Sequence, residues 1–177
     1  MKIFKLFFVV ILFHSANFAT IRNARPDSTI SFITTERKLS NDQKTGVINQ
    51  AFWNVELKTI DGKILEMKSF KGKYVYLNFW GEWCPGCREE MPSIVQAHKK
   101  FNDKAEFIGL LKPHNLEKAK TFIDEQGMDF PVVLLEKQLK NKFNFDGFPL
   151  SILIFPDGKT YLRADEVNKN FFEENIK

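Results

Sequence analysis

The chain has few of the cysteine and histidine side chains on which small disulfide-rich and zinc-binding proteins depend. Its 177 residues include two cysteines and three histidines. A disulfide framework needs more cysteines, and a tetrahedral zinc site built on one Cys-x-x-Cys pair needs two further ligands at a suitable spacing. The chain must therefore fold by burying an apolar core, for which its 44% of hydrophobic residues suffice.

A strong excess of one charge and a long apolar run are also missing. The formal net charge is +4, and the basic residues are scattered along the chain without a nucleic-acid-binding motif. We therefore expect no nucleic-acid partner. The unbroken apolar run Leu6–Phe13 is far shorter than the roughly 20 residues of a membrane-spanning helix.

That run belongs to a pattern typical of a secretory signal peptide over residues 1–19. Lys2 and Lys5 precede it, and small and polar residues follow it up to Ala19, where we place the cleavage. The alternative is an uncleaved membrane anchor that starts at Ile3. We expect a periplasmic or otherwise extracytoplasmic protein, which is membrane-anchored in the alternative case.

The rest of the chain divides into two predicted segments. Residues 20–45 are rich in Ser, Thr, Asn and charged side chains, which is typical of a linker or a loosely attached extension. Within this segment, Thr29–Thr34 has the composition of an edge strand. Residues 46–177 alternate strand and helix patterns, so we predict one α/β domain there.

The predicted domain begins with a hairpin over residues 53–67, because alternating apolar residues flank Asp61-Gly62, a dipeptide that suits a tight turn. The remaining apolar patterns predict a central mixed β-sheet flanked by helices. The expected strands are residues 74–80, 106–111, 130–135, 150–155 and 160–164, and the expected helices are residues 84–101, 115–126, 137–143 and 168–176.

Both cysteines lie where a predicted strand gives way to a predicted helix. Cys84 would stand in the first helical turn, where unpaired backbone N–H groups and the positive end of the helix dipole favour a thiolate. Cys87 follows about one helical turn later and lies further inside. This arrangement permits a two-step exchange, in which Cys84 attacks a substrate disulfide and Cys87 resolves the mixed disulfide.

Two stretches of the chain resemble a known family. They are YVYLNFWGEWCPGC, residues 74–87, and GFPLSILIFPDGK, residues 147–159. Both resemble the thioredoxin superfamily, and specifically the secreted TlpA/ResA-like thiol–disulfide oxidoreductases. The resemblance covers about residues 47–177 and implies a thioredoxin-like fold with an N-terminal β-hairpin extension.

The resemblance also implies roles for single residues. Cys84 matches the attacking cysteine and Cys87 the resolving one, and their disulfide is the only redox group expected, with no other cofactor and no metal. Pro149 matches the cis-proline beside the cysteine pair, which would leave the backbone of Phe148 free to pair with an extended substrate. We place Trp83 on the same substrate-binding side.

Glu90 matches an active-site glutamate of ResA-like proteins, where a carboxylate could tune the thiol pKa values and move protons. Its alternative is a solvated acid of the first helical turn, favoured by the helix dipole, as we expect for Glu89. Ordinary thioredoxins carry a buried aspartate where this chain has Asn78. Because Asn78 cannot serve as a base, this departure favours Glu90 as the group that handles protons.

Other interpretations of the cysteine pair stay open at this point. It could be an inert buried thiol pair, or half of a zinc site completed by His98 and His114. A thioredoxin-fold carrier could hold a soft metal such as Cu(I) between the two sulfur atoms. A thiol peroxidase is a further alternative, although residues 81–83, Gly-Glu-Trp, replace the Thr-x-x sequence that such enzymes place before their cysteine.

The function predicted from these residues is that of an exported thiol–disulfide oxidoreductase that reduces protein disulfides, in cytochrome c maturation or in redox homeostasis. Because an extracytoplasmic compartment is oxidising, the cysteine pair must be reduced again after each turnover. The resemblance implies a membrane thiol–disulfide electron donor as a second partner. A copper carrier and a disulfide-donating oxidase are the alternatives.

Overall fold

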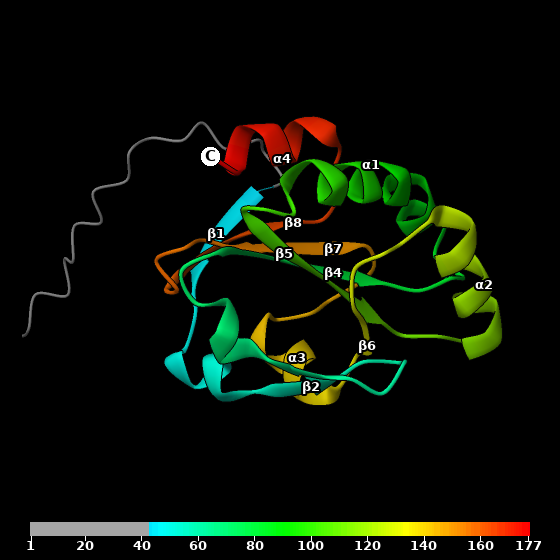
Figure 1. Ribbon diagram of the computed structural model, residues 1–177, viewed down its shortest axis with the longest axis horizontal. Helices are drawn as coiled ribbons and strands as arrows, with labels where there is room; N and C mark the ends of the chain where they lie inside the picture. Colours follow the sequence, from blue (N-terminus) through cyan, green and yellow to red (C-terminus); the bar gives the residue numbers. More distant parts are fainter. Residues whose placement is uncertain (1–42) are drawn as a thin grey trace, which may run out of the picture. The chain divides into compact units, whose positions relative to one another are not determined.

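The computed structural model describes residues 43–177 (Figure 1). The predicted signal peptide over residues 1–19 and the strand expected at Thr29–Thr34 lie outside this range. Within residues 43–177, no helix is long and apolar enough to cross a membrane. The division of the chain at residues 19 and 45 stays a prediction.

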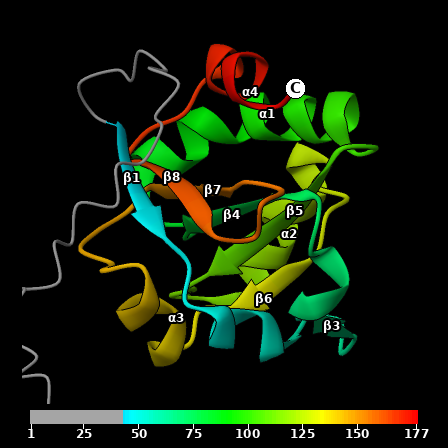
Figure 2. The same cartoon turned by 90° about the vertical axis from the view of Figure 1, so that its left-hand side faces the viewer.

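A six-stranded mixed sheet forms the centre of the described residues, as Figures 1 and 2 show. β4 pairs in parallel with β5, and β5 with β6, whereas β7 and β8 continue the sheet on the other side in antiparallel pairing. The order across the sheet is β1-β8-β7-β4-β5-β6. The strands are β1 (Gln43–Val47), β4 (Tyr74–Trp80), β5 (Ala105–Leu111), β6 (Val132–Leu134), β7 (Leu150–Ile154) and β8 (Thr160–Ala164).

β1 forms one edge of the sheet and was not predicted from the sequence. Its first three residues fall inside the segment interpreted as a polar linker. β1 pairs antiparallel with β8 along all five of its residues, from Gln43 opposite Ala164 to Val47 opposite Thr160. The strand therefore depends on backbone pairing with a partner more than a hundred residues away. Its mostly polar side chains lack the pattern of apolar residues from which a strand is predicted.

The predicted hairpin is confirmed, but it forms a small sheet of its own. β2 (Glu56–Lys58) pairs antiparallel with β3 (Ile64–Glu66), and the turn between them has Gly62 at a positive φ of 91°. A bridge from Thr59 to Val133 attaches the hairpin to the middle of β6. Two short 3₁₀ helices that the sequence analysis missed flank it, η1 (Gln50–Asn54) and η2 (Met67–Phe70).

The helices cover both faces of the sheet, which confirms the predicted α/β layers. One face carries the first apolar core, to which α1, α2 and α4 contribute, and the other carries a second core with η1, β2 and α3. Figure 2 shows α1 and α4 on one side of the strands and α3 on the other. The helices are α1 (Pro85–Phe101), α2 (Leu116–Gln126), α3 (Lys137–Lys142) and α4 (Lys169–Asn175).

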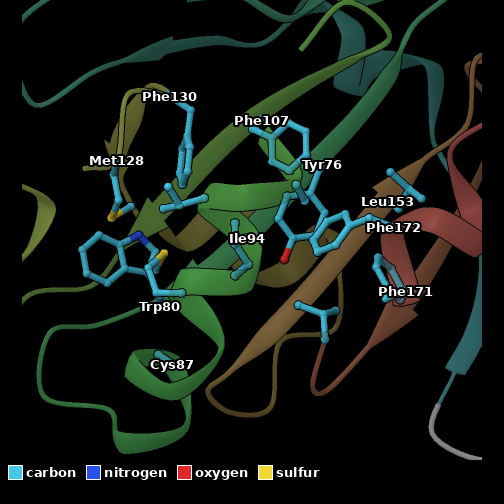
Figure 3. Packing of buried hydrophobic residues seen from close by; sticks show 14 of the residues in the cluster. Tyr76, Trp80, Cys87, Ile94, Phe107, Met128, Phe130, Leu153, Phe171 and Phe172 are labelled. Carbon is cyan, nitrogen blue, oxygen red and sulfur yellow. The ribbon is translucent and has the colours of Figure 1, made fainter. Parts of the chain in front are cut away.

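The central strand β4 serves both cores, because its side chains alternate between the two faces. Tyr76 and Trp80 belong to the first core, whereas Leu77 and Phe79 belong to the second. In the first core the ring of Tyr76 lies 5.1 Å from that of Phe107 and 5.0 Å from that of Phe172 (Figure 3). These buried aromatic contacts hold α4 against the sheet, and α1 lies beside α4.

Arg163 on β8 binds residues 143–146, the segment that leads to Phe148 and Pro149. Its Nη1 donates to the carbonyl oxygens of Phe143 and Asn144 at 2.9 and 3.0 Å, and its Nη2 donates to the carboxylate of Asp146. The Arg163 side chain is mostly buried.

We expect Arg163→Met to lower the free energy of unfolding by about 2 kcal/mol, since hydrogen bonds to a charged donor contribute about 1.5–3 kcal/mol. Urea unfolding followed by circular dichroism measures the loss. The matched control is Glu173→Gln, which removes an exposed ion pair with Lys100 and should change stability by at most about 1 kcal/mol. Equal effects of the two substitutions would contradict the prediction.

Candidate active site

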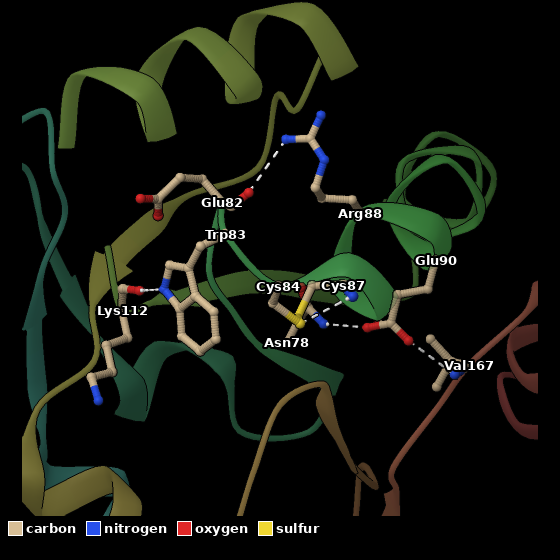
Figure 4. Close-up of a disulfide and its surroundings, with 9 residues drawn as sticks. All are labelled: Asn78, Glu82, Trp83, Cys84, Cys87, Arg88, Glu90, Lys112 and Val167. Atoms are coloured by element: carbon tan, nitrogen blue, oxygen red, sulfur yellow. Dashed lines mark hydrogen bonds between the residues drawn. A yellow bond between two sulfur atoms is a disulfide. The ribbon is translucent and has the colours of Figure 1, made fainter. Parts of the chain in front are cut away.

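The two cysteines lie at the carboxyl end of the central strand β4, where α1 begins (Figure 4). They form a disulfide with their Cα atoms 5.3 Å apart. This edge of an α/β sheet is where reactive and binding groups usually gather. The strand and the helix that flank the pair were both predicted, so the position of the cysteines in the fold follows from the sequence pattern.

Cys84 is the N-cap of α1, one residue before the first turn in which the sequence analysis placed it. Its backbone is extended, and its Sγ accepts a hydrogen bond from the backbone N–H of Cys87 at 3.2 Å. After reduction, the same N–H and the positive end of the helix dipole would stabilise negative charge on this sulfur. The geometry therefore favours Cys84 as the thiolate.

The two cysteines differ in their exposure to solvent. Cys84 is 4% exposed, whereas Cys87 is 0% exposed and lies in the first apolar core with Trp80 and Met91. An incoming substrate meets Cys84 before Cys87. This order supports the predicted attacking role of Cys84 and the resolving role of Cys87, and both roles stay predictions.

Glu90 is a buried carboxylate one helical turn after Cys87. It is 7% exposed, and it accepts hydrogen bonds from Asn78 Nδ2 at 3.2 Å and from the backbone N–H of Val167 at 3.1 Å. Burial raises the pKa of Glu90 to about 7, although both hydrogen bonds act to lower it. The alternative interpretation of Glu90 as a solvated acid is therefore wrong, whereas Glu89 is exposed as expected.

Asn78 stands on β4 between Tyr76 and Trp80 and is completely buried. Its amide nitrogen bonds to Glu90, while its Oδ1 has no hydrogen-bond partner in the part of the chain that the structure describes. Asn78 thus holds the Glu90 carboxylate toward the sheet. The structure brings the Cys-x-x-Cys helix, the central strand and the segment before α4 together at this carboxylate.

The predicted substrate-binding residues also meet at the disulfide. The peptide bond between Phe148 and Pro149 is cis, as predicted. A Cβ placed on Gly86, which lies between the cysteines, would stand 3.4 Å from the Pro149 ring, so this ring packs against the Cys-x-x-Cys turn. The ring of Phe148 meets that of Trp83 edge to face at 5.4 Å. Trp83, Phe148 and Pro149 thus form one continuous surface beside the disulfide.

Glu82 is a site residue that the sequence analysis missed, since nothing in its spacing separates it from a solvated loop acid. It is 8% exposed, and its Oε1 accepts the backbone N–H groups of His114 and Asn115 at 2.9 and 2.7 Å. The ring of His114 stacks on Trp83 at 4.5 Å. His114 is therefore part of the site, although the sequence offered no partner for it.

Two other residues singled out from the sequence, His98 and Trp80, belong to packed parts of the fold. His98 has a partner that the sequence did not reveal, because its Nδ1 lies 2.8 Å from the Asp129 carboxylate. Trp80 is fully buried, as expected of a core aromatic. Among residues 43–177, no group of three or more His, Cys, Asp and Glu side chains could hold a metal ion.

A mixed sheet with a Cys-x-x-Cys disulfide at the start of its first long helix, packed against a cis-proline, defines the class of thioredoxin-like proteins. Comparison with known proteins then gives the family. The AhpC/TSA family model matches residues 48–156, which is more than half of the chain. The chain belongs to this family, and within it to the ResA-like proteins of the thioredoxin superfamily, which confirms the resemblance read from the sequence.

Two relatives and one solved structure illustrate the similarity. The thiol-disulfide oxidoreductase ResA of Bacillus thuringiensis (strain Al Hakam) is 36% identical over 60% of this chain, which spans 62% of that relative. ResA of Bacillus cereus (strain ATCC 10987 / NRS 248) is 31% identical over 84% of this chain and 87% of the relative. A thiol:disulfide interchange protein from Chlorobium tepidum TLS has a TM-score of 0.62 and 29% identity, over 68% of this chain and 89% of its own.

Proposed function

We propose that the protein is an exported thiol–disulfide oxidoreductase that reduces disulfides in other proteins. One observation carries the proposal: Cys84 is the N-cap of α1, and its sulfur accepts the backbone N–H of Cys87 at the positive end of the helix dipole. The ResA relatives are named thiol-disulfide oxidoreductases, which supports the same activity for this chain.

In the proposed reaction the reduced protein attacks as the Cys84 thiolate. The thiolate forms a mixed disulfide with one substrate sulfur, and the other substrate sulfur leaves and takes up a proton. Cys87 then loses its proton and attacks Cys84 Sγ, which releases the second substrate thiolate and closes the Cys84–Cys87 disulfide. Two electrons pass to the substrate in each cycle, so a donor must reduce the pair again.

Glu90 is the proposed proton acceptor for Cys87 in the second step. The two residues lie three positions apart on the buried side of α1. With a pKa of about 7, Glu90 can take up a proton and return it at neutral pH, which is the condition for efficient acid–base catalysis. The hydrogen bonds from Asn78 and Val167 keep the carboxylate at this position during the cycle.

The substrate is proposed to be an extended polypeptide that lies across Trp83, Phe148 and Pro149. These residues line one side of the disulfide with apolar rings. Phe148 lies two residues before the start of β7, and its backbone is proposed to pair with a substrate strand beside the reacting sulfur.

Export and the electron donor complete the proposal. The signal-like pattern of residues 1–19 supports a periplasmic or otherwise extracytoplasmic location. Since disulfides persist in such compartments, a membrane thiol–disulfide donor would return the pair to the reduced state. Cytochrome c maturation and redox homeostasis are the two processes in which this chemistry would serve.

The reduction potential of the Cys84–Cys87 pair tests the direction of electron flow. The oxidised protein is equilibrated with glutathione and with dithiothreitol couples, and tryptophan fluorescence from Trp80 and Trp83 follows the reduced fraction. We expect a potential well below about −200 mV, as for a reductant that needs a donor. A value near about −120 mV, typical of strong oxidants, would make the protein a disulfide donor instead.

A further inference from the structure

The Glu82 carboxylate, two residues before Cys84, is not used in the mechanism above. Glu82 is buried, and both hydrogen bonds that its carboxylate accepts come to a single oxygen, Oε1, from the backbone N–H groups of His114 and Asn115. The other oxygen, Oε2, has no partner within residues 43–177. No salt bridge within these residues involves Glu82 either, so its charge is held by backbone groups.

These backbone groups belong to the loop between β5 and α2. Asn115 is the N-cap of α2, and its own side chain accepts the N–H of Lys118 at 3.0 Å. A carboxylate at the start of a helix is stabilised by the helix dipole in addition to its hydrogen bonds. Because burying a carboxylate is otherwise costly, the contact fixes the loop firmly to the Cys-x-x-Cys segment.

The same loop holds Trp83 from two directions. The indole Nε1 of Trp83 donates to the carbonyl oxygen of Lys112 at 3.0 Å, and the ring of His114 stacks on the indole at an interplanar angle of 10°. A Cβ on Gly81 would lie 2.6 Å from Trp83 Nε1, so the indole can fold back over this position only because the residue is glycine. Trp83 is thus fixed although it is 39% exposed.

The position of Trp83 links this loop to the site. Trp83 directly precedes Cys84, and its ring touches Phe148, which precedes the cis-proline. Figure 4 shows the indole of Trp83 between Lys112 and the disulfide, with the Glu82 carboxylate on the side away from the sulfur atoms. Glu82 therefore acts on the substrate surface through the loop and not by contact with the reacting atoms.

We propose that Glu82 is a positioning residue for polypeptide substrates. It anchors residues 112–115, which in turn hold the Trp83 indole in a fixed position beside Cys84. This inference rests on the proposed exchange reaction and deepens it. A substrate that extends beyond its cysteine contacts the Trp83 indole, whereas a small disulfide contacts only the Cys84 sulfur. A purely structural role of Glu82 would lower stability and leave the preference between the two substrates unchanged.

The test compares two disulfides with the protein kept reduced by an added thiol reductant, whose direct reaction with each disulfide is subtracted: a peptide of about ten residues with an aromatic residue next to its disulfide-bonded cysteine, and bis(2-hydroxyethyl) disulfide. The readout is the ratio of kcat/KM for the peptide to kcat/KM for the small disulfide. We expect Glu82→Ala to lower this ratio about tenfold, mainly through KM of the peptide, since a tenfold change corresponds to about 1.4 kcal/mol. Glu82→Gln retains an oxygen acceptor and should restore most of the ratio.

Two further variants secure the result. His114→Ala removes the exposed stacking partner of Trp83 without touching the buried carboxylate, so it decides the question even if Glu82→Ala does not fold; we expect it to lower the ratio as well. Glu89→Ala, an exposed acid on α1, is the matched control and should leave the ratio unchanged. An unchanged ratio in folded Glu82→Ala and His114→Ala would overturn the inference, whereas a wild type that reduces neither disulfide would overturn the proposed function itself.

Discussion

Cys84→Ser is expected to abolish disulfide reduction, with a loss of at least about a thousandfold in turnover. The thiolate is the nucleophile in thiol–disulfide exchange, and a serine hydroxyl stays protonated and unreactive at neutral pH. Cys87→Ser should behave differently, because Cys84 keeps its position as the N-cap of α1 and its reactivity. The first step then proceeds and the second cannot, so the mixed disulfide accumulates.

Mass spectrometry after incubation with a peptide disulfide separates these two outcomes. We expect a covalent peptide adduct on Cys84 of the Cys87→Ser protein, which dithiothreitol releases, and no adduct on the Cys84→Ser protein. The basis is the difference in exposure, since Cys87 is wholly inside the first apolar core. An adduct on Cys87 of Cys84→Ser, with none on Cys84 of Cys87→Ser, would exchange the roles assigned to the two sulfurs.

Much of the fold could be predicted because its signals are local. The apolar run of β4 has the bounds Tyr74 and Trp80 in both the prediction and the structure. α2 begins after an Asn115 cap and ends at Gly127, which adopts the left-handed conformation that glycine allows. β1 carries no such signal, since its residues are mostly polar and pair with the distant strand β8.

The site was predictable to the same extent. The spacing of Cys84 and Cys87 indicated the chemistry proposed here, and Glu90, three residues after Cys87, shares the buried side of α1 by helical periodicity. The raised pKa of Glu90 was not predictable, because it depends on burial among segments distant in sequence, including Val167. Glu82 was missed for the same reason: its hydrogen-bond partners lie more than thirty residues away.

Glu90→Gln is expected to remove a pH-dependent part of the stability. The pKa of Glu90 is about 7 in the folded protein, against 4.5 for a free glutamate. Between these values the folded state binds more protons than the unfolded state, so this contribution is fully present below about pH 4.5 and is lost as the pH rises to about 7. At 1.36 kcal/mol per pKa unit, the total loss is about 3 kcal/mol.

The difference in unfolding free energy between Glu90→Gln and the wild type isolates this contribution, because the other groups titrate equally in both proteins. From pH 4 to pH 8 it should shift by about 3 kcal/mol in favour of Glu90→Gln, as measured by urea unfolding of the oxidised proteins. Glu89→Gln is the control, since Glu89 is exposed and should show no such shift. A pH-independent difference for Glu90→Gln would mean that the carboxylate titrates normally.

The same substitution tests whether Glu90 handles the proton of Cys87. If it does, kcat of the wild type plotted against pH should show an inflection near pH 7. Glu90→Gln should lose that inflection and turn over more slowly at every pH. The peptide adduct on Cys84 should accumulate in this variant, because the second step is slowed. A lower stability alone would change neither the inflection nor the adduct. If the inflection stays in Glu90→Gln, Glu90 is not the group that titrates, and it serves to hold Asn78 and the segment at Val167 in place.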